Sequence, residues 1–460
     1  MKKIIISILF CGLLAMSLAS QNVRSVYFLN DWNHRSSLNA SFATENGFLS
    51  FPLGNTEFGI SSNTGLSNYL YPYNNELVTF LHPSVDGHAF LDKLQPDIYL
   101  NQNLNVNILS VGYHSKKAFW TFDYRLKENL NINIPQDFFR LIKLGFEHST
   151  NQFDLKKLSL EQSNISEFSL GYSRDINSKI RVGAKINLLC GISAEKIKYN
   201  QFDILLSNDN YEINATGESV VMSDVLTFKT DANNNFNFAD YNVNLTSQKP
   251  VGTGVSVNLG VTYQPIKNLT LSAAINDLGF MSWNAAGIKK GIASSNINFT
   301  GFSAVNLDSI DIEGQLNQLE QGVNNLILFK KQAQTTQNIF ETIPCTINVS
   351  AEYSFFNSKE KDIRLGLLWN SYNSYTLHQN ELMGALTVKP AQTITLSATY
   401  AFLRNDSNHF GFAFNYSPRW INVFFATDFL ANQLSPQFLP IHQFDINFQA
   451  GISFYLGDDQ

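Results

Sequence analysis

The chain has 460 residues and a formal net charge of -6, which gives no sign of a basic nucleic-acid-binding protein. Apolar residues make up 44% and the mean hydropathy is -0.11, which argues against a bundle of membrane-spanning helices. A membrane β-barrel is compatible with these values because strand alternation hides its apolar half, and 37 Phe and 18 Tyr residues suit lipid-facing strands and interfacial girdles. A large all-β secreted protein is the alternative class.

The N-terminus has the pattern of a secretory signal peptide. Lys2 and Lys3 precede a mostly apolar run over 4–18, and small residues surround Ala19. We therefore expect residues 1–19 to be a signal peptide that is cleaved after Ala19 and directs export. No later apolar run is long enough for a transmembrane helix.

Residues 20–46 are polar and aromatic and show no strand pattern. We expect this N-terminal segment on the periplasmic side, where it either threads back into a barrel lumen as a hatch or hangs free.

The rest of the chain, 47–460, is predicted to form an all-β transmembrane antiparallel β-barrel of about fourteen strands. Apolar and polar residues alternate in many segments that are bounded by Pro, Asn, Asp and Ser. The predicted strands are 47–62, 103–113, 117–126, 160–173, 179–192, 251–263, 268–280, 343–356, 361–370, 376–389, 392–402, 409–416, 420–427 and 441–457.

Short turns and longer connections alternate along these strands, as in bacterial barrels with short periplasmic turns and long outer loops. The even number of strands then places both termini in the periplasm. The strand count stays open by two, because 203–229 can hold an extra hairpin.

Three of the long loops carry helix signals, which predict helical segments on the extracellular side. Pro135 and Gly145 bracket one amphipathic segment, a second covers 312–326, and a shorter one contains Phe90. The apolar faces of the two longer helices either pack, plug the lumen, or bind a hydrophobic ligand or partner. The candidate binding surface consists of Phe138, Phe139, Leu141, Ile142, Leu316, Leu319, Val323 and Leu326.

The C-terminal segment 444–456 alternates without a fault over thirteen residues, which predicts a long strand with one apolar face. Such a strand can cross a bilayer, where a tilted strand needs about 9–11 residues. Its apolar positions include Phe444, Ile446, Phe448, Ile452, Phe454 and Leu456.

No motif for catalysis or for a cofactor is present. None of the eight His residues has a metal-binding spacing, and no P-loop, nucleophile elbow or C-x-x-C occurs. We expect no enzyme, no catalytic residue, no metal and no cofactor. Cys190 and Cys345 fall in predicted strands as wall residues. Asp277 is interpreted as a carboxylate that accepts backbone N–H bonds at a strand end, and a ligand-binding carboxylate is the alternative.

The order of several short motifs resembles an uncharacterised family of FadL-like outer-membrane barrels from Bacteroidota. These motifs are 37–42, 48–54, 134–139, 170–174, 276–280 with Trp283, and 343–344 with 351–353. The family usually has Asn-Pro-Ala in the first motif, where this chain lacks the proline. Wider relatives are similar to long-chain fatty acid transporters with fourteen strands and an N-terminal hatch.

The resemblance implies an outer-membrane protein, with membrane lipid around it, whose last strand is read by the barrel assembly machinery. The predicted function is passage or uptake of small hydrophobic compounds. The alternative is a non-transporting accessory barrel that docks a secretion or assembly complex, in which the same loop surface binds a protein. We expect no nucleic acid as a partner.

Overall fold

A computed structural model describes residues 23–74, 76–145, 151–207, 211–230, 235–243, 249–299, 328–358, 360–373, 378–404, 407–430 and 444–456. The predicted signal peptide, the predicted helix 312–326 and the loop residues Leu316, Leu319, Val323 and Leu326 lie outside these ranges. Within the described residues, no helix combines the length and the apolar character that a membrane crossing needs.

Fourteen antiparallel strands close into a barrel, which confirms the predicted fold class. The first of them is interrupted and consists of β1 (Gly47–Ser50) and β2 (Thr56–Ser62), which both pair with the last strand and with β5. The others follow in chain order as β5 (Asp97–Ser115), β6 (Ala118–Pro135), β8 (Ser159–Asp175), β9 (Ile180–Leu206), β13 (Gly252–Ile266), β14 (Leu269–Trp283), β18 (Cys345–Ser354), β19 (Asp362–Asn373), β20 (His378–Ala391), β21 (Ile394–Arg404), β22 (Ser407–Tyr416), β23 (Ile421–Leu430) and β24 (Phe444–Leu456).

Several strands are longer than predicted, and the loops contain further strands. The second half of β9 extends beyond its pairing with β13 and pairs with β10 (Tyr211–Ser223), which in turn pairs with β15 (Ile288–Phe299). This hairpin occupies the region where the sequence left an extra one open. The remaining loop strands are β3 (Leu70–Tyr73), β4 (Glu76–Thr79), β7 (Asn151–Asp154), β11 (Leu226–Thr230), β12 (Asn235–Val243), β16 (Leu328–Lys331) and β17 (Ile339–Thr342).

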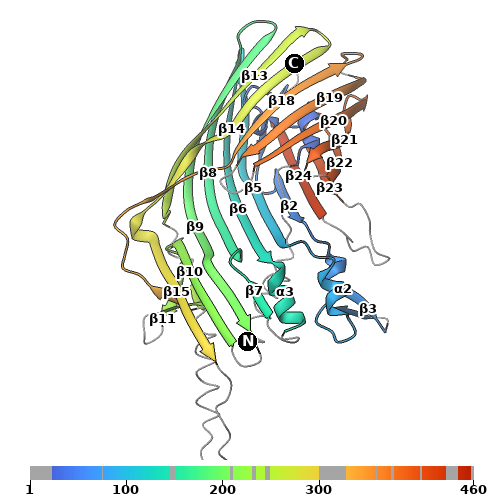
Figure 1. Cartoon of the computed structure of the whole chain (residues 1–460). Helices are drawn as coiled ribbons and strands as arrows, with labels where there is room; N and C mark the ends of the chain where they lie inside the picture. The colour runs from blue at the N-terminus through green and yellow to red at the C-terminus, as the bar shows by residue number, and fades with distance from the viewer. Residues whose placement is uncertain are drawn as a thin grey trace, which may run out of the picture.

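Among the described loop residues, two short α-helices lie where the sequence predicted them. They are α2 (Gly87–Leu91) and α3 (Gln136–Lys143), and Gly145 follows α3 with a φ of +61°. Figure 1 shows α2, α3, β7, β10 and β15 at one end of the barrel, which we call the loop end. The opposite end carries the short turns after β5, β8 and β13, and we call it the turn end.

The barrel wall buries polar side chains and exposes apolar ones. In β24, Asn447, Gln449 and Ser453 are 2–4% exposed. By contrast, Ile452, Phe454 and Leu456 are 40–47% exposed. This inverted pattern is expected of a strand whose outer face contacts lipid.

Aromatic residues gather on the outer face near the turn end. Trp120 packs against Tyr172 with 4.6 Å between ring centroids, and both are exposed. Tyr263, Tyr353 and Tyr416 occupy the same level on other strands. Such a girdle marks the boundary between hydrocarbon and water, so the structure is a transmembrane β-barrel.

Candidate functional site

The N-terminal segment forms a plug inside the barrel. Every described residue from 23 to 46 is buried or half-buried except Glu45 and Asn46, and the segment contains only two single-turn helices, η1 (Ser25–Phe28) and η2 (Arg35–Ser37). Of the two placements that the sequence left open, the structure therefore shows the one inside the lumen. We call residues 23–46 the plug.

Three carboxylates on three strands hold the first residues of the plug. The Val23 amide donates to Glu57 Oε1 on β2 (2.8 Å), and the Arg24 amide donates to Asp428 Oδ2 on β23 (2.5 Å). The Arg24 guanidinium pairs with Glu381 on β20 (2.5 Å). This part of the plug is thereby attached to both sides of the closing strand pair β24 and β2.

Further contacts attach the plug to the opposite wall and to the strands between. Lys389 Nζ pairs with Asp31 (3.0 Å), and the Tyr27 hydroxyl bonds to Ser272 (3.0 Å). At Gly183 and Gly260 the wall has no side chain, which leaves room for the plug backbone at residues 39–41. The plug is therefore packed closely against the inner face of the wall.

A row of alternating charges lies on the inner wall beside the plug. Asp123 pairs with Lys185 (2.6 Å) and with Arg125 (3.2 Å), and Lys127 pairs with Glu167 (2.5 Å). These side chains come from β6, β8 and β9 and compensate one another. Buried charges need such pairing because an isolated charge in a low-dielectric interior is strongly unfavourable.

His34 of the plug is buried next to this row. Its ring packs edge-on against Phe48, with 5.2 Å between centroids. Burial, together with the positive charges of Arg125 and Lys185, lowers the pKa of His34 to about 4. The imidazole is therefore neutral at pH 7.

Asp277 has a different role from the one interpreted from the sequence. It lies within β14 at a bulge, with a φ of +59°, and its carboxylate accepts from Lys127 Nζ (3.4 Å) and from Asn187 Nδ2 (3.2 Å). The sequence predicted backbone N–H donors at a strand end. In the structure, the Asp277 carboxylate instead accepts from side chains of other strands on the inner wall. Sequence alone could not show these partners because they lie on other strands.

The predicted strand 47–62 is wrong in one respect, because residues 51–55 leave the ladder. Leu49 pairs with Phe454 and Thr56 pairs with Ala450, so seven steps of the first strand face only four steps of β24. The three surplus residues form a turn at Pro52, closed by a Gly54 amide bond to the Phe51 carbonyl (2.8 Å). Leu53 has a φ of +73°, which a bulky residue adopts only under strain.

This interruption bends into the lumen about halfway across the wall. The Gly54 carbonyl packs on the inner face of Gly451, and Gln449 Nε2 donates to Asn55 Oδ1 (2.7 Å). Phe51 and Leu53 remain 53% and 69% exposed, respectively. Over residues 451–453, β24 therefore has no ladder partner on this side, next to two exposed apolar side chains.

The inner wall on the loop side of the plug is polar. Asn101, Asn103 and Asn105 of β5 line it beside Asn129 and Lys127 of β6, because alternate residues of paired strands share one face. The described residues thus show no continuous apolar path from the loops into the lumen.

The described part of the predicted loop surface is mostly engaged in packing. Phe139 is buried with Phe80 and Phe90 of the α2 region, and Phe138 and Leu141 are half-buried. Ile142 is half-buried as well. Phe138 contacts both this cluster and a second one around Phe153, so α3 joins two loop regions. Whether any of this surface binds a ligand or a partner stays a prediction.

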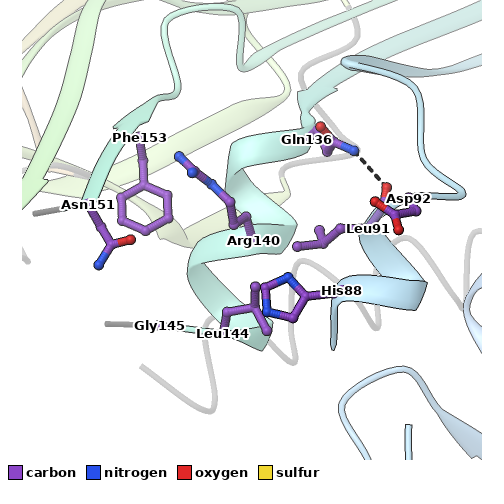
Figure 2. A pocket seen from close by; sticks show the side chains of 9 residues that line it. All are labelled: His88, Leu91, Asp92, Gln136, Arg140, Leu144, Gly145, Asn151 and Phe153. Atoms are coloured by element: carbon purple, nitrogen blue, oxygen red, sulfur yellow. Dashed lines mark hydrogen bonds between the residues drawn. The ribbon is translucent and has the colours of Figure 1, made fainter. Parts of the chain in front are cut away.

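A pocket of about 300 Å³ lies between α2, α3 and β7 (Figure 2). The Arg140 guanidinium lies 4.4 Å from the centroid of the Phe153 ring, and Gln136 Nε2 donates to the Leu91 carbonyl (2.7 Å). The pocket is lined by His88, Leu91, Asp92, Gln136, Arg140, Leu144, Gly145, Asn151 and Phe153. This mixed polar lining differs from the apolar collecting surface that the helix pattern predicted.

The site thus consists of a transmembrane barrel, an internal plug and a broken first strand. Residues 40–428 match the family of unknown function DUF5723, and the chain belongs to this family. No curated protein matches the chain.

Solved FadL-like barrels are similar in overall fold. The toluene transporter TbuX of Ralstonia pickettii is 7% identical with a TM-score of 0.44, and the match covers 92% of this chain and 93% of that chain. The toluene transporter TodX of Pseudomonas putida is 10% identical with a TM-score of 0.40, covering 91% and 92%. A FadL homologue of Pseudomonas aeruginosa is 10% identical with a TM-score of 0.37, covering 96% and 97%.

Proposed function

We propose that the protein is an outer-membrane barrel for the passage of small hydrophobic compounds, which leave the lumen sideways through the interrupted first strand. The loop end faces outward in this proposal, and the turn end faces the periplasm. The observation that carries it is the combination of the plug with the break at residues 51–55.

The plug favours a sideways exit. A compound that continued along the barrel axis would have to displace residues whose amides and side chains are bonded to β2, β20 and β23. The break lies beside the first plug residues, because Val23 bonds to Glu57 only two residues after the break. A sideways exit therefore avoids the loss of the buried ion pairs, each of which is expensive to break on one side.

The polar inner wall indicates which hydrophobic compounds the barrel would pass. A pure hydrocarbon gains nothing from the amides of Asn101, Asn103 and Asn105, whereas a compound with one hydrogen-bonding group does. Its apolar part would then contact Phe51 and Leu53 at the break and continue into lipid. The proposed substrate is a small hydrophobic compound with a single polar group.

Deletion of residues 52–54 tests the proposal. Removing three residues restores the register between the first strand and β24, so the ladder becomes continuous across the break. We expect the barrel to fold and reach the membrane while uptake of N-phenyl-1-naphthylamine falls to the level of cells without the protein. Uptake by intact cells is followed by the fluorescence of the probe.

The control keeps the length of the break and leaves Phe51 and Leu53 in place, in the variant Pro52→Ser. The turn is closed by the bond from the Gly54 amide to the Phe51 carbonyl, which does not involve Pro52, so this variant should keep the turn and retain most of the uptake. Unchanged uptake in the deletion variant, at equal surface levels, would refute the sideways exit. Loss of a co-purifying protein without any change in uptake would instead favour the accessory docking barrel.

A further inference from the structure

The outer wall has a hollow of about 430 Å³ that crosses β13, β14, β18, β19 and β20. Its floor lies over Ala273 and Ala351, two small residues on neighbouring strands. Tyr263 and Leu271 border it on one side, and Trp369 borders it on the other. Elsewhere on the wall, outward positions of adjacent strands carry mostly larger apolar residues.

The hollow is mostly apolar, and the polar groups of its border are the Tyr263 hydroxyl and the Trp369 indole N–H. The hydroxyls of Ser272 and Ser350 lie beneath its floor, but they bond to each other (2.7 Å), and Ser272 also bonds to Tyr27 of the plug (3.0 Å). These groups are therefore satisfied from the lumen side. Over its floor, an occupant of the hollow is therefore held by apolar contacts.

The position of the hollow sets it within the membrane. Ala351 is three residues from the end of β18, and Leu271 is two residues from the start of β14, both at the turn end. At about 3.3 Å per residue, the near edge of the hollow lies roughly 7–10 Å along the strands from that end. The hydrocarbon core is about 30 Å thick, so the hollow opens to the leaflet on the turn side.

We propose that this hollow binds one acyl chain of a glycerophospholipid in the leaflet at the turn end. The hollow is continuous with the lipid-facing wall, and an unfilled void would forfeit the dispersion contacts of its lining. A flexible acyl chain is narrow enough to lie along the hollow across five strands. Tyr263, in the aromatic girdle, lies at the level where the ester and headgroup region of the lipid begins. This inference needs only the membrane-spanning barrel and holds whether or not the protein passes hydrophobic compounds.

The test fills the hollow with bulky side chains. Purified wild-type protein in mild detergent, the double variant Ala273→Phe with Ala351→Phe, and the variant Ala398→Phe are compared by native mass spectrometry for retained phospholipid. Ala398 is an exposed outward residue that does not line the hollow, so it is the matched control. The heat-modified gel mobility of each protein reports folding.

We expect wild type and Ala398→Phe to retain one phospholipid per barrel, and the filled variant to retain at least about fivefold less. If the filled variant does not fold, Ala273→Leu with Ala351→Leu takes its place, with the same expectation. Equal retention in all folded proteins would overturn the proposal. A wild-type dimer that dissociates in the filled variant would also overturn it, since a second copy would then be the occupant.

Discussion

Gly183 shows how closely the barrel wall approaches the plug. A Cβ atom at this position would lie 2.0 Å from the Ala40 carbonyl oxygen and 2.6 Å from the Ser41 amide nitrogen. Both neighbours are backbone atoms, which cannot rotate away as a side chain can. The absence of a side chain at Gly183 is therefore a condition for the plug to lie where it does.

The variant Gly183→Ala should loosen the plug. Overpacking of this kind costs about 1–3 kcal/mol, and the plug is the part that can move. We expect a higher ion conductance in planar lipid bilayers than for wild type. Gly384→Ala is the control, because a Cβ there meets only the Tyr400 carbonyl at 4.0 Å. Equal conductance of both variants would contradict the close packing.

His34 gives the plug a pH dependence whose sign follows from its pKa. The folded pKa is about 4 and the ordinary value is 6.5, so between these values the unfolded chain binds a proton that the folded protein does not. Stability from this group is complete above pH 6.5 and is lost as the pH falls toward 4. At pH 5 the loss amounts to about 2 kcal/mol.

Comparison with His34→Gln isolates this effect, because the other titrating groups are common to both proteins. We expect the free energy of unfolding in detergent to fall by about 2 kcal/mol more for wild type than for the variant between pH 7 and pH 5. Urea titrations at the two pH values measure it. The same loss in both proteins would show that His34 titrates normally.

At the scale of the element, β24 has the bounds that its alternation predicted. Phe448 packs against Phe58 of β2 with 4.7 Å between centroids, on the outer face. The polar face of β24 does not line open water. Asn447 on this face is buried, and its side-chain amide donates to Asp445 (2.9 Å). We therefore expect substitutions at Asn447 to destabilise the barrel, even though this residue faces the inside of the barrel and not the lipid.

The variant Phe448→Arg should impair folding into bilayers. An Arg on the lipid face near the midplane costs about 2–4 kcal/mol. Phe448→Leu keeps the position apolar and is the control, for which we expect a cost below about 1.5 kcal/mol. The folded fraction in lipid vesicles, read from gel mobility without heating, measures both. A well-folded Arg variant would exclude this face from the hydrocarbon.

For the whole molecule, the proposed orientation places the loop end outside the cell. A protease site inserted at Ser84, in the exposed turn between β4 and α2, should be cut on intact cells. The same site at Lys267, in the turn between β13 and β14, should be cut only after the outer membrane is breached. Cleavage at Lys267 on intact cells would reverse the orientation.

The sequence determined the features that depend on neighbouring residues. Alternation over two residues placed β24 and most wall strands, because each side chain of a strand faces the side opposite to that of the next. Pro135 and Gly145 located α3, because proline is favoured where a helix begins, here as the residue just before Gln136, and glycine adopts the positive φ after the helix.

Tertiary structure alone decided where the plug lies, which charges meet and where the wall breaks. Arg24 bonds to Asp428 although the two are 404 residues apart in the sequence. Lys127 bonds to Asp277 across a sequence separation of 150 residues. The surplus of three residues in the first strand exists only relative to the register of β24. Such features arise when the barrel closes, since closure is what brings the first and last strands and the segment before them into contact.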